Sequence, residues 1–303
     1  MIIIKDIAIL LVSIIVIGKG AVWLVDAAAR VAKHFGISEL VIGLTVVAFG
    51  TSAPEFGVTI LAAIRGMGDI SVGNIVGSNI FNLGFILGGT AIIHSLKTSR
   101  TVVFRDGIFL LFGGILLSVF LWDLTLSKIE GIILFTLLVL YLLYLYVKKE
   151  SIEEEKPTHA MYRWDPILLF VGVGLVIVGS HFLVESAVNI ARFMGVSDWV
   201  IGATIIAAGT SAPEFATSLT AAMKSRYGMS VGNLIGSDIF NLFGVLGVAG
   251  MMRNLSVGHD AHINLIILSF MIAVVIIFMR TGSVSYTHLR AHETSLHLVC
   301  RLL

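Results

Sequence analysis

The chain has 303 residues, of which 57% are hydrophobic and 13% charged, with a mean hydropathy of +1.00 and a formal net charge of +1. Soluble domains carry about 25% charged residues, so this composition excludes an ordinary soluble protein. One cysteine and four prolines exclude a disulfide scaffold and a collagen-like chain. The near-zero charge argues against a nucleic-acid partner. An integral membrane protein surrounded by lipid remains.

Long apolar runs indicate where the chain crosses the membrane, because a spanning helix needs roughly 20 apolar residues. A β-barrel would instead need runs of alternating apolar and polar residues, which residues 132–147 do not show. We therefore predict an all-α polytopic membrane protein. Its predicted spanning helices lie at residues 7–29, 39–64, 70–94, 103–122, 127–147, 166–191, 197–223, 229–252 and 261–280.

Lysine and arginine gather on one set of alternate loops, and such residues favour the cytoplasmic side. Arg30, Lys148 and Lys224 belong to the rich set, whereas Arg65 and Arg192 belong to the poor set. We therefore expect the N-terminus outside and the longest loop inside the cell. Short loops and the lack of a targeting segment favour the cell membrane as the location.

The two halves of the chain repeat each other. Adding 159 to a residue number lays residues 41–88 on residues 200–247 with 26 identities in 48 positions. Five crossings separate the equivalent first spans, so the two repeats enter the membrane from opposite sides. Asp26 aligns with Glu185, late in these first spans, where a role at the helix end is expected. Inverted repeats are typical of secondary transporters, which bind their substrates at the repeat interface near the midplane.

The repeat divides the chain into four parts, with five spans in the first repeat and four in the second. Residues 285–294 resemble translated sequencing-adapter sequence, so we expect the polar tail to be an artefact or the mark of a truncation rather than a metal-binding segment. We therefore expect a tenth helix to be missing or replaced in this chain. The parts are a first repeat at 1–147, a cytoplasmic linker at 148–165, a second repeat at 166–280 and the tail at 281–303.

Glu55 and Glu214 occupy equivalent positions near the middle of the second and seventh spans. Ionisable residues at that depth are costly and usually functional, although a neutral glutamic acid bonded to another helix is the alternative. Pro54 and Pro213 precede them, and proline removes an N–H and clashes with the carbonyl four residues earlier. We expect both spans to be discontinuous there. The breaks should free the carbonyls at residues 48–51 and 207–210, which a cation could receive.

The repeated motifs offer carboxylate, hydroxyl, amide and carbonyl oxygens, and neither imidazole nor thiolate. Hard oxygen ligands suit Ca2+ or Na+, and two carboxylates neutralise one divalent cation. Residues four apart lie on one helix face where helical geometry holds. Four pairs have that spacing: Thr51 with Glu55, Thr210 with Glu214, Ser78 with Asn82, and Ser237 with Asn241.

The motif GTSAPE at residues 50–55 and 209–214, followed by GSNIFN at 77–82 and GSDIFN at 236–241, resembles the two alpha repeats of the sodium/calcium exchanger family within the cation/calcium antiporters. The resemblance runs from about residue 7 to 280. It implies Ca2+ bound by the two glutamates, Na+ in overlapping sites and no cofactor. It further implies ion contacts from Thr51, Ser52, Ser78, Asn82, Thr210, Ser211 and Ser237, and from the carbonyls of Ala48 and Ala207.

One position departs from the family pattern. Several members carry aspartate where this chain has Asn241, whereas here an aspartate stands three positions earlier, at Asp238. Residues three apart occupy neighbouring parts of one helix face, so Asp238 either compensates or faces another helix. The coupling ion, Na+ or H+, stays open for this reason.

The first hypothesis is an antiporter in which Ca2+ and Na+ compete for one midplane site that opens alternately to each side as spans one and six slide across the core. Its nearest rival keeps the site and replaces Na+ by H+. A passive cation channel is a third possibility, against which the interrupted helices argue. No catalytic arrangement is visible, so an enzyme is not expected. The oligomeric state stays open and is compatible with a monomer.

Overall fold

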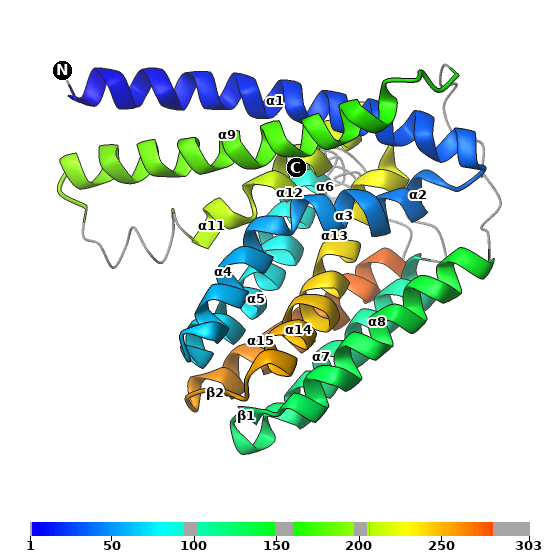
Figure 1. Ribbon diagram of the computed structural model, residues 1–303, viewed down its shortest axis with the longest axis vertical. Helices are drawn as coiled ribbons and strands as arrows, with labels where there is room; N and C mark the ends of the chain where they lie inside the picture. Colours follow the sequence, from blue (N-terminus) through cyan, green and yellow to red (C-terminus); the bar gives the residue numbers. More distant parts are fainter. Residues whose placement is uncertain (1, 94–101, 149–159, 197–204, 206, 281–303) are drawn as a thin grey trace, which may run out of the picture.

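A computed structural model describes residues 2–93, 102–148, 160–196, 205 and 207–280 of the chain. The middle of the predicted linker, at 149–159, and the polar tail, at 281–303, lie outside the described residues. Within them the chain is almost wholly helical, as in Figure 1. This follows from the apolar runs, since a backbone in lipid must satisfy its hydrogen bonds within its own segment.

The first half begins with one long helix, continues through two spans that change helical geometry midway, and ends with a hairpin of two helices. The segments η1, η2 and η3 are π-helical, and η4 is a short 3-10 turn. In chain order the elements are α1 (Ile2–Phe35), α2 (Glu39–Ile42), η1 (Gly43–Val47), α3 (Ala48–Thr51), α4 (Ala53–Ile64), α5 (Gly68–Phe81), η2 (Asn82–Leu87), α6 (Gly88–Ile93), η3 (Val102–Gly107), α7 (Ile108–Phe120), η4 (Leu121–Asp123), β1 (Thr125–Leu126) and α8 (Lys128–Lys148).

The second half follows the same order, with a π-helical segment, η6, after its third helix. The short strands β1 and β2 pair antiparallel and join the hairpins of the two halves. The described elements are α9 (Asp165–Phe193), α11 (Ala207–Thr210), α12 (Ala212–Met223), α13 (Tyr227–Ile239), η6 (Phe240–Val245), α14 (Leu246–Met252), β2 (Leu255–Ser256) and α15 (Asp260–Arg280).

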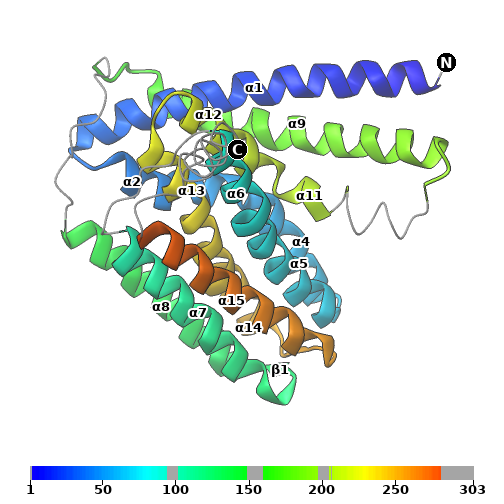
Figure 2. The same ribbon diagram turned by 180° about the vertical axis from the view of Figure 1, so that it is seen from behind.

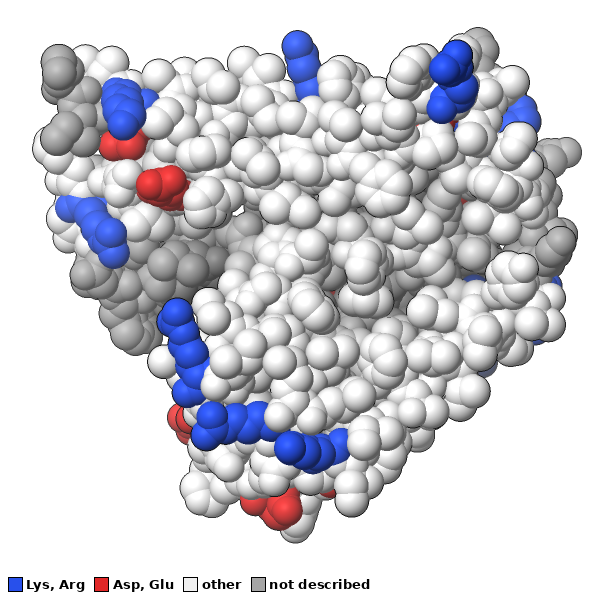
Figure 3. All heavy atoms as spheres, viewed as in Figure 1, with Lys and Arg blue, Asp and Glu red and all other residues white. Residues whose placement is uncertain are grey.

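Seven described helices are long and apolar enough to cross a membrane, and the bent pair Glu39–Thr51 and Ala53–Ile64 makes an eighth. These eight coincide with eight of the predicted spans and confirm an all-α polytopic membrane protein. The remaining predicted span, 197–223, is described continuously only from Ala207. Figure 3 agrees with this assignment, because the Lys, Arg, Asp and Glu residues visible in the view lie at its lower end and along its upper and left edges, whereas the wide central surface is uncharged.

α1 and α9 form a pair that crosses one side of a bundle made by the other helices (Figures 1 and 2). Gly20 and Gly172 let the two backbones approach closely. The contacts at the two ends show that the helices run antiparallel. At one end the Arg30 guanidinium binds the Asp165 carboxylate at 2.7 Å. At the other end Asn189 Nδ2 donates to Asp6 Oδ1 at 3.3 Å. These end contacts are equivalent at the offset of 159, so equivalent helices run in opposite directions.

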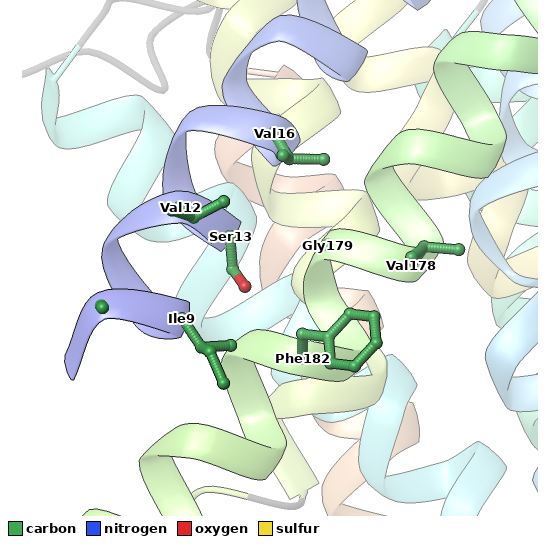
Figure 4. A pocket seen from close by; sticks show the side chains of 8 residues that line it. Ile9, Val12, Ser13, Val16, Val178, Gly179 and Phe182 are labelled. Carbon is green, nitrogen blue, oxygen red and sulfur yellow. The ribbon is translucent and has the colours of Figure 1, made fainter. Parts of the chain in front are cut away.

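An apolar groove opens between the N-terminal half of α1 and the C-terminal half of α9, and Figure 4 shows Ile9, Val12 and Phe182 around it. Ser13 is its one polar lining residue. The glutamates of the repeated motif do not line it, so this groove suits a lipid chain and is not the ion site.

The bundle is centred on α13, whose span, Tyr227–Met252, is 83% buried. Two glycines let the broken first-half span approach α13 closely. A Cβ on Gly236 would lie 2.6 Å from the Leu44 carbonyl oxygen, and one on Gly232 would lie 2.6 Å from the Leu40 carbonyl oxygen. The interface between the two repeats is therefore tightly packed backbone against backbone, as in other membrane helix pairs with small residues at the contact.

The contact between α1 and α9 yields a stability prediction. A Cβ on Gly172 would lie 2.8 Å from the Leu24 nitrogen, whereas one on Gly174, on the same helix, would meet nothing within 4 Å. Gly172→Val should destabilise the protein by about 1–3 kcal/mol more than Gly174→Val, because overpacking occurs only at residue 172 whereas the change in helix propensity is the same at both positions. Thermal unfolding in detergent measures this difference, and equal midpoints for the two variants would contradict the packing described.

Candidate functional site

Both motif helices break two residues before their prolines, at Ser52 and Ser211. The segments before and after Ser52 are bent by 51° relative to each other. Ser52 (φ −79°, ψ 8°) and Ser211 (φ −88°, ψ 8°) leave the helical conformation, and Pro54 and Pro213 lie in the first turns of α4 and α12. Proline is tolerated there because the first turn lacks intrahelical partners for its N–H groups. The predicted discontinuity of both helices is confirmed.

The break releases fewer carbonyls than predicted. The Ala48 carbonyl accepts the Ser52 N–H at 3.0 Å and the Thr51 hydroxyl at 3.3 Å, so the expectation that it is freed is wrong. The reason is that the helical hydrogen bond from the Ser52 N–H to the Ala48 carbonyl is still formed at the break. Gly50 is the residue whose usual donor is missing, because Pro54 has no N–H. In the second repeat Ala207 begins α11.

The two glutamates lie wholly buried and reach across the repeat interface to each other's serines. The Ser211 hydroxyl donates to Glu55 Oε1 at 3.1 Å, and the Ser52 hydroxyl donates to Glu214 Oε1 at 3.0 Å. These bonds are exact counterparts at the offset of 159. The second oxygen, Oε2, of each glutamate is buried and has no hydrogen-bond partner among the described residues. Each carboxylate also lies in the first turn of its helix, where the helix dipole favours negative charge.

Each motif threonine contacts the glutamate of the opposite repeat. Thr51 and Ser237 border the Glu214 carboxylate, and Thr210 borders that of Glu55. The Thr51 hydroxyl also lies 3.1 Å from Asn233 Oδ1 and 3.4 Å from Ser237 Oγ. The shared helix face expected of Thr51 with Glu55, and of Thr210 with Glu214, depended on helical geometry between the paired residues. The break between the paired residues interrupts the helical geometry on which the four-residue spacing depends.

Two asparagines that the sequence reasoning assigned no role hold the glutamate backbones. Asn74 Nδ2 donates to Thr59 Oγ1 at 3.0 Å and lies 3.4 Å from the Glu55 carbonyl oxygen. Asn233 makes the same contacts in the other half, at 2.9 Å to Ser218 and 3.4 Å to the Glu214 carbonyl. A stripe of polar residues at helical spacing could have found them: Ser71, Asn74, Ser78 and Asn82 in one repeat, and Ser230, Asn233, Ser237 and Asn241 in the other.

A second oxygen cluster lies where α5 and α13 pass into π-helical turns. Asn82 Nδ2 donates to Asp238 Oδ1 at 2.9 Å, and its counterpart Asn241 Nδ2 donates to Asn79 Oδ1 at 3.0 Å. Asn79 Nδ2 in turn donates to the Asp238 carbonyl at 3.1 Å. Asp238 thus faces the opposite repeat. Among the described residues, Asp238 Oδ2, Asn82 Oδ1 and Asn241 Oδ1 are buried without a hydrogen-bond partner.

The structure therefore brings most of the predicted side-chain ligands to the interface between the repeats. Ser78 is also buried, on α5. Buried polar atoms without partners are rare, and those named above are oxygens that accept rather than donate. The described residues hold no cluster of three or more His, Cys, Asp or Glu side chains that could bind a metal. The oxygens are those of the two glutamates, of Asp238 and of neutral hydroxyl and amide groups. Hard cations without a strict geometry suit such a site. A buried oxygen site between two broken helices of a membrane bundle defines a cation transporter of the secondary type.

Comparison with known proteins places the chain more closely. The family model described as "Sodium/calcium exchanger protein" matches residues 5–147 and 164–298. The putative antiporter CaxA of Alkalimonas amylolytica is 33% identical, over 90% of this chain and 89% of its own. The sodium/calcium exchanger MaX1 of Methanosarcina acetivorans is 32% identical, over 82% and 83%. The sodium-calcium exchanger NCX_Mj, in crystals soaked with Na+ and Sr2+, aligns with a TM-score of 0.83 and 32% identity over 94% of both chains.

The chain belongs to the sodium/calcium exchanger family. It is a multi-pass membrane antiporter and not an enzyme, as the repeated motif predicted.

The paired serine bonds predict equal effects in the two repeats. Ser52→Ala and Ser211→Ala should each destabilise the ion-free protein by about 1–3 kcal/mol, because each leaves a buried glutamate oxygen without its donor. Ser180→Ala is the matched control, since the Ser180 hydroxyl is buried and has no partner among the described residues. Thermal unfolding in a chelating buffer measures the three variants. Effects confined to one serine of the pair would contradict the symmetric arrangement.

Proposed function

We propose that this protein exchanges Ca2+ for Na+ across the cell membrane at the site between Glu55 and Glu214. The observation that carries the proposal is the pair of buried carboxylates, each with one oxygen bonded to a serine of the other repeat and one oxygen without a partner among the described residues. Buried anions of this kind need a positive charge nearby. Two of them supply the charge that neutralises one Ca2+.

The oxygens around the glutamates match the coordination that Ca2+ requires. Ca2+ takes six to eight oxygen ligands in a pliable shell, and Na+ accepts similar neutral oxygens. The name of MaX1 and the Na+, Ca2+ and Sr2+ soaks of NCX_Mj support this pair of ions. The proposed ligands beyond the glutamates are the side chains of Thr51, Ser52, Ser78, Asn82, Thr210, Ser211, Ser237, Asp238 and Asn241, and the carbonyl of Ala207.

We further propose that the site is reached from one side of the membrane at a time. The antiparallel pair α1 and α9 moves across the bundle formed by the remaining helices. This movement opens the site to one side of the membrane and closes it to the other. The opposite directions of these two equivalent helices support two related states. The distribution of lysine and arginine favours an N-terminus outside the cell and the linker inside.

Asp238 carries the third negative charge in this proposal. It stands one turn before Asn241 and binds the amide of Asn82 across the interface. We assign it to Na+ coordination, with the unpartnered oxygens of the two asparagines. Coupling to H+ in place of Na+ is the competing function, and the gradient experiment separates the two.

Transport of 45Ca2+ into proteoliposomes tests the function. We expect uptake driven by an outward Na+ gradient, and loss of that uptake in Glu55→Gln and Glu214→Gln because neither variant can neutralise Ca2+. Glu130→Gln is the control, since Glu130 caps α8 far along the chain from the motif. Uptake that follows only an outward H+ gradient would show that the coupling ion is H+ and not Na+. Passive uptake without either gradient would indicate a channel.

The assignment of Asp238 yields a separate prediction. Asp238→Asn should raise the Na+ concentration for half-maximal exchange about tenfold, because a charge-assisted contact is worth about 1.5–3 kcal/mol. The Ca2+ requirement should change less, since both glutamates remain. Asp260→Asn, a substitution at the exposed start of α15, is the control. An unchanged Na+ dependence would exclude Asp238 as a ligand.

A further inference from the structure

We propose that two ion pairs related by the repeat, Lys224 with Asp26 and Arg65 with Glu185, form alternately and close the site on opposite sides of the membrane. We call them the gate pairs. The proposal rests on the alternating access proposed above, and it assigns that access to particular charged residues outside the ion site.

The gate pairs are equivalent in sequence. Adding 159 carries Asp26 to Glu185 and Arg65 to Lys224, so each pair joins an acidic residue of a first-span helix to a basic residue at the end of a motif helix. Asp26 and Glu185 lie on α1 and α9, and Arg65 and Lys224 directly follow α4 and α12. Charge is retained at all four positions although aspartate and glutamate, or lysine and arginine, are exchanged.

One gate pair is formed in the structure. Lys224 Nζ lies 2.7 Å from both carboxylate oxygens of Asp26, with about a third of each side chain exposed. α1 also packs along α12 beside this ion pair. The pair α1 and α9 is therefore fastened to the bundle at the end where Lys224 lies, which is the side rich in lysine and arginine.

The other gate pair is open. No ion pair joins Arg65 to Glu185, although the structure describes both residues, and Glu185 instead faces His181 of its own helix at 4.0 Å. α9 also makes little contact with α4, whereas the equivalent helices α1 and α12 pack closely. The helix pair α1 and α9 thus covers α12 and leaves α4 largely uncovered.

This difference does not come from the ion site. The serine bonds to the glutamates and the bonds of Asn74 and Asn233 are matched between the repeats, so this part of the core is alike in the two halves. The asymmetry lies in the position of α1 and α9 on that core. Because these helices bind each other at both ends, through Arg30 and Asp165 and through Asp6 and Asn189, they move as one unit.

A single displacement then acts on both gate pairs. In the state obtained by exchanging the roles of the repeats, Glu185 takes the position relative to Arg65 that Asp26 now has relative to Lys224. Such a movement separates Asp26 from Lys224 at the same time. An exposed ion pair shifts an equilibrium by up to about fivefold, so each gate pair biases the two states without locking either one.

Sided kinetics test the bias. Asp26→Asn and Lys224→Met should change the ratio of half-saturating Ca2+ at the two faces about two- to fivefold in favour of the Lys224 side, because they weaken the closed gate. Glu185→Gln and Arg65→Met should move the ratio in the opposite direction. A role in stability alone would lower exchange without moving the ratio. The swapped variant Asp26→Lys with Lys224→Asp should restore it, and Lys19→Met, on the exposed face of α1, is the control.

Cross-linking tests directly whether the open gate closes during exchange. In a Cys300→Ser background, Arg65→Cys with Glu185→Cys should cross-link during exchange and stop it until the link is reduced. Arg65→Cys with Gly174→Cys, which faces open space, should not cross-link. Suppose that the wild-type chain exchanges Ca2+, but Arg65→Cys with Glu185→Cys never cross-links and no variant changes the ratio of half-saturating Ca2+ at the two faces. The proposal of the gate pairs is then wrong, whereas the proposed exchange function is unaffected. A wild-type chain without exchange overturns the proposed function itself.

Discussion

Glu55 and Glu214 lie wholly buried at the interface of the two halves, and removing each charge from water costs several kcal/mol unless opposite charge and hydrogen bonds compensate. The chain meets this cost in part with serine hydroxyls from the opposite repeat and with the N-terminal turns of α4 and α12. One oxygen of each carboxylate keeps no partner among the described residues. In the proposed function a bound cation relieves the remaining cost, which couples the structure of the interface to the ion.

The helix breaks and the second oxygen cluster follow from the same constraint. Pro54 and Pro213 end one helical segment and begin the next, so a helix start points at each carboxylate. Asn74 and Asn233 then fix the glutamate backbones from the neighbouring helices α5 and α13. Because each half supplies the same parts, the site is built twice from one pattern and completed only when the halves meet.

A symmetric site does not by itself transport anything, because exchange requires two states of unequal access. The inequality lies in α1 and α9, which cover α12 and leave α4 exposed, and in the gate pairs that accompany this position. The proposed movement of a rigid helix pair over the core would need little rearrangement of the proposed ion ligands. Ion occupancy can then decide which state is favoured through small differences in free energy.

The sequence by itself determined the class of protein, the spans, the repeat, the breaks at the two prolines and the pair of buried glutamates, because hydropathy, proline chemistry and the cost of a buried charge act locally along the chain. Only the tertiary structure decided that Thr51 serves Glu214, that Asn233 holds a backbone carbonyl, and that Asp26 is paired while Glu185 is not. Those contacts join residues far apart in the chain. They depend on how closely whole helices approach, which no local spacing rule specifies.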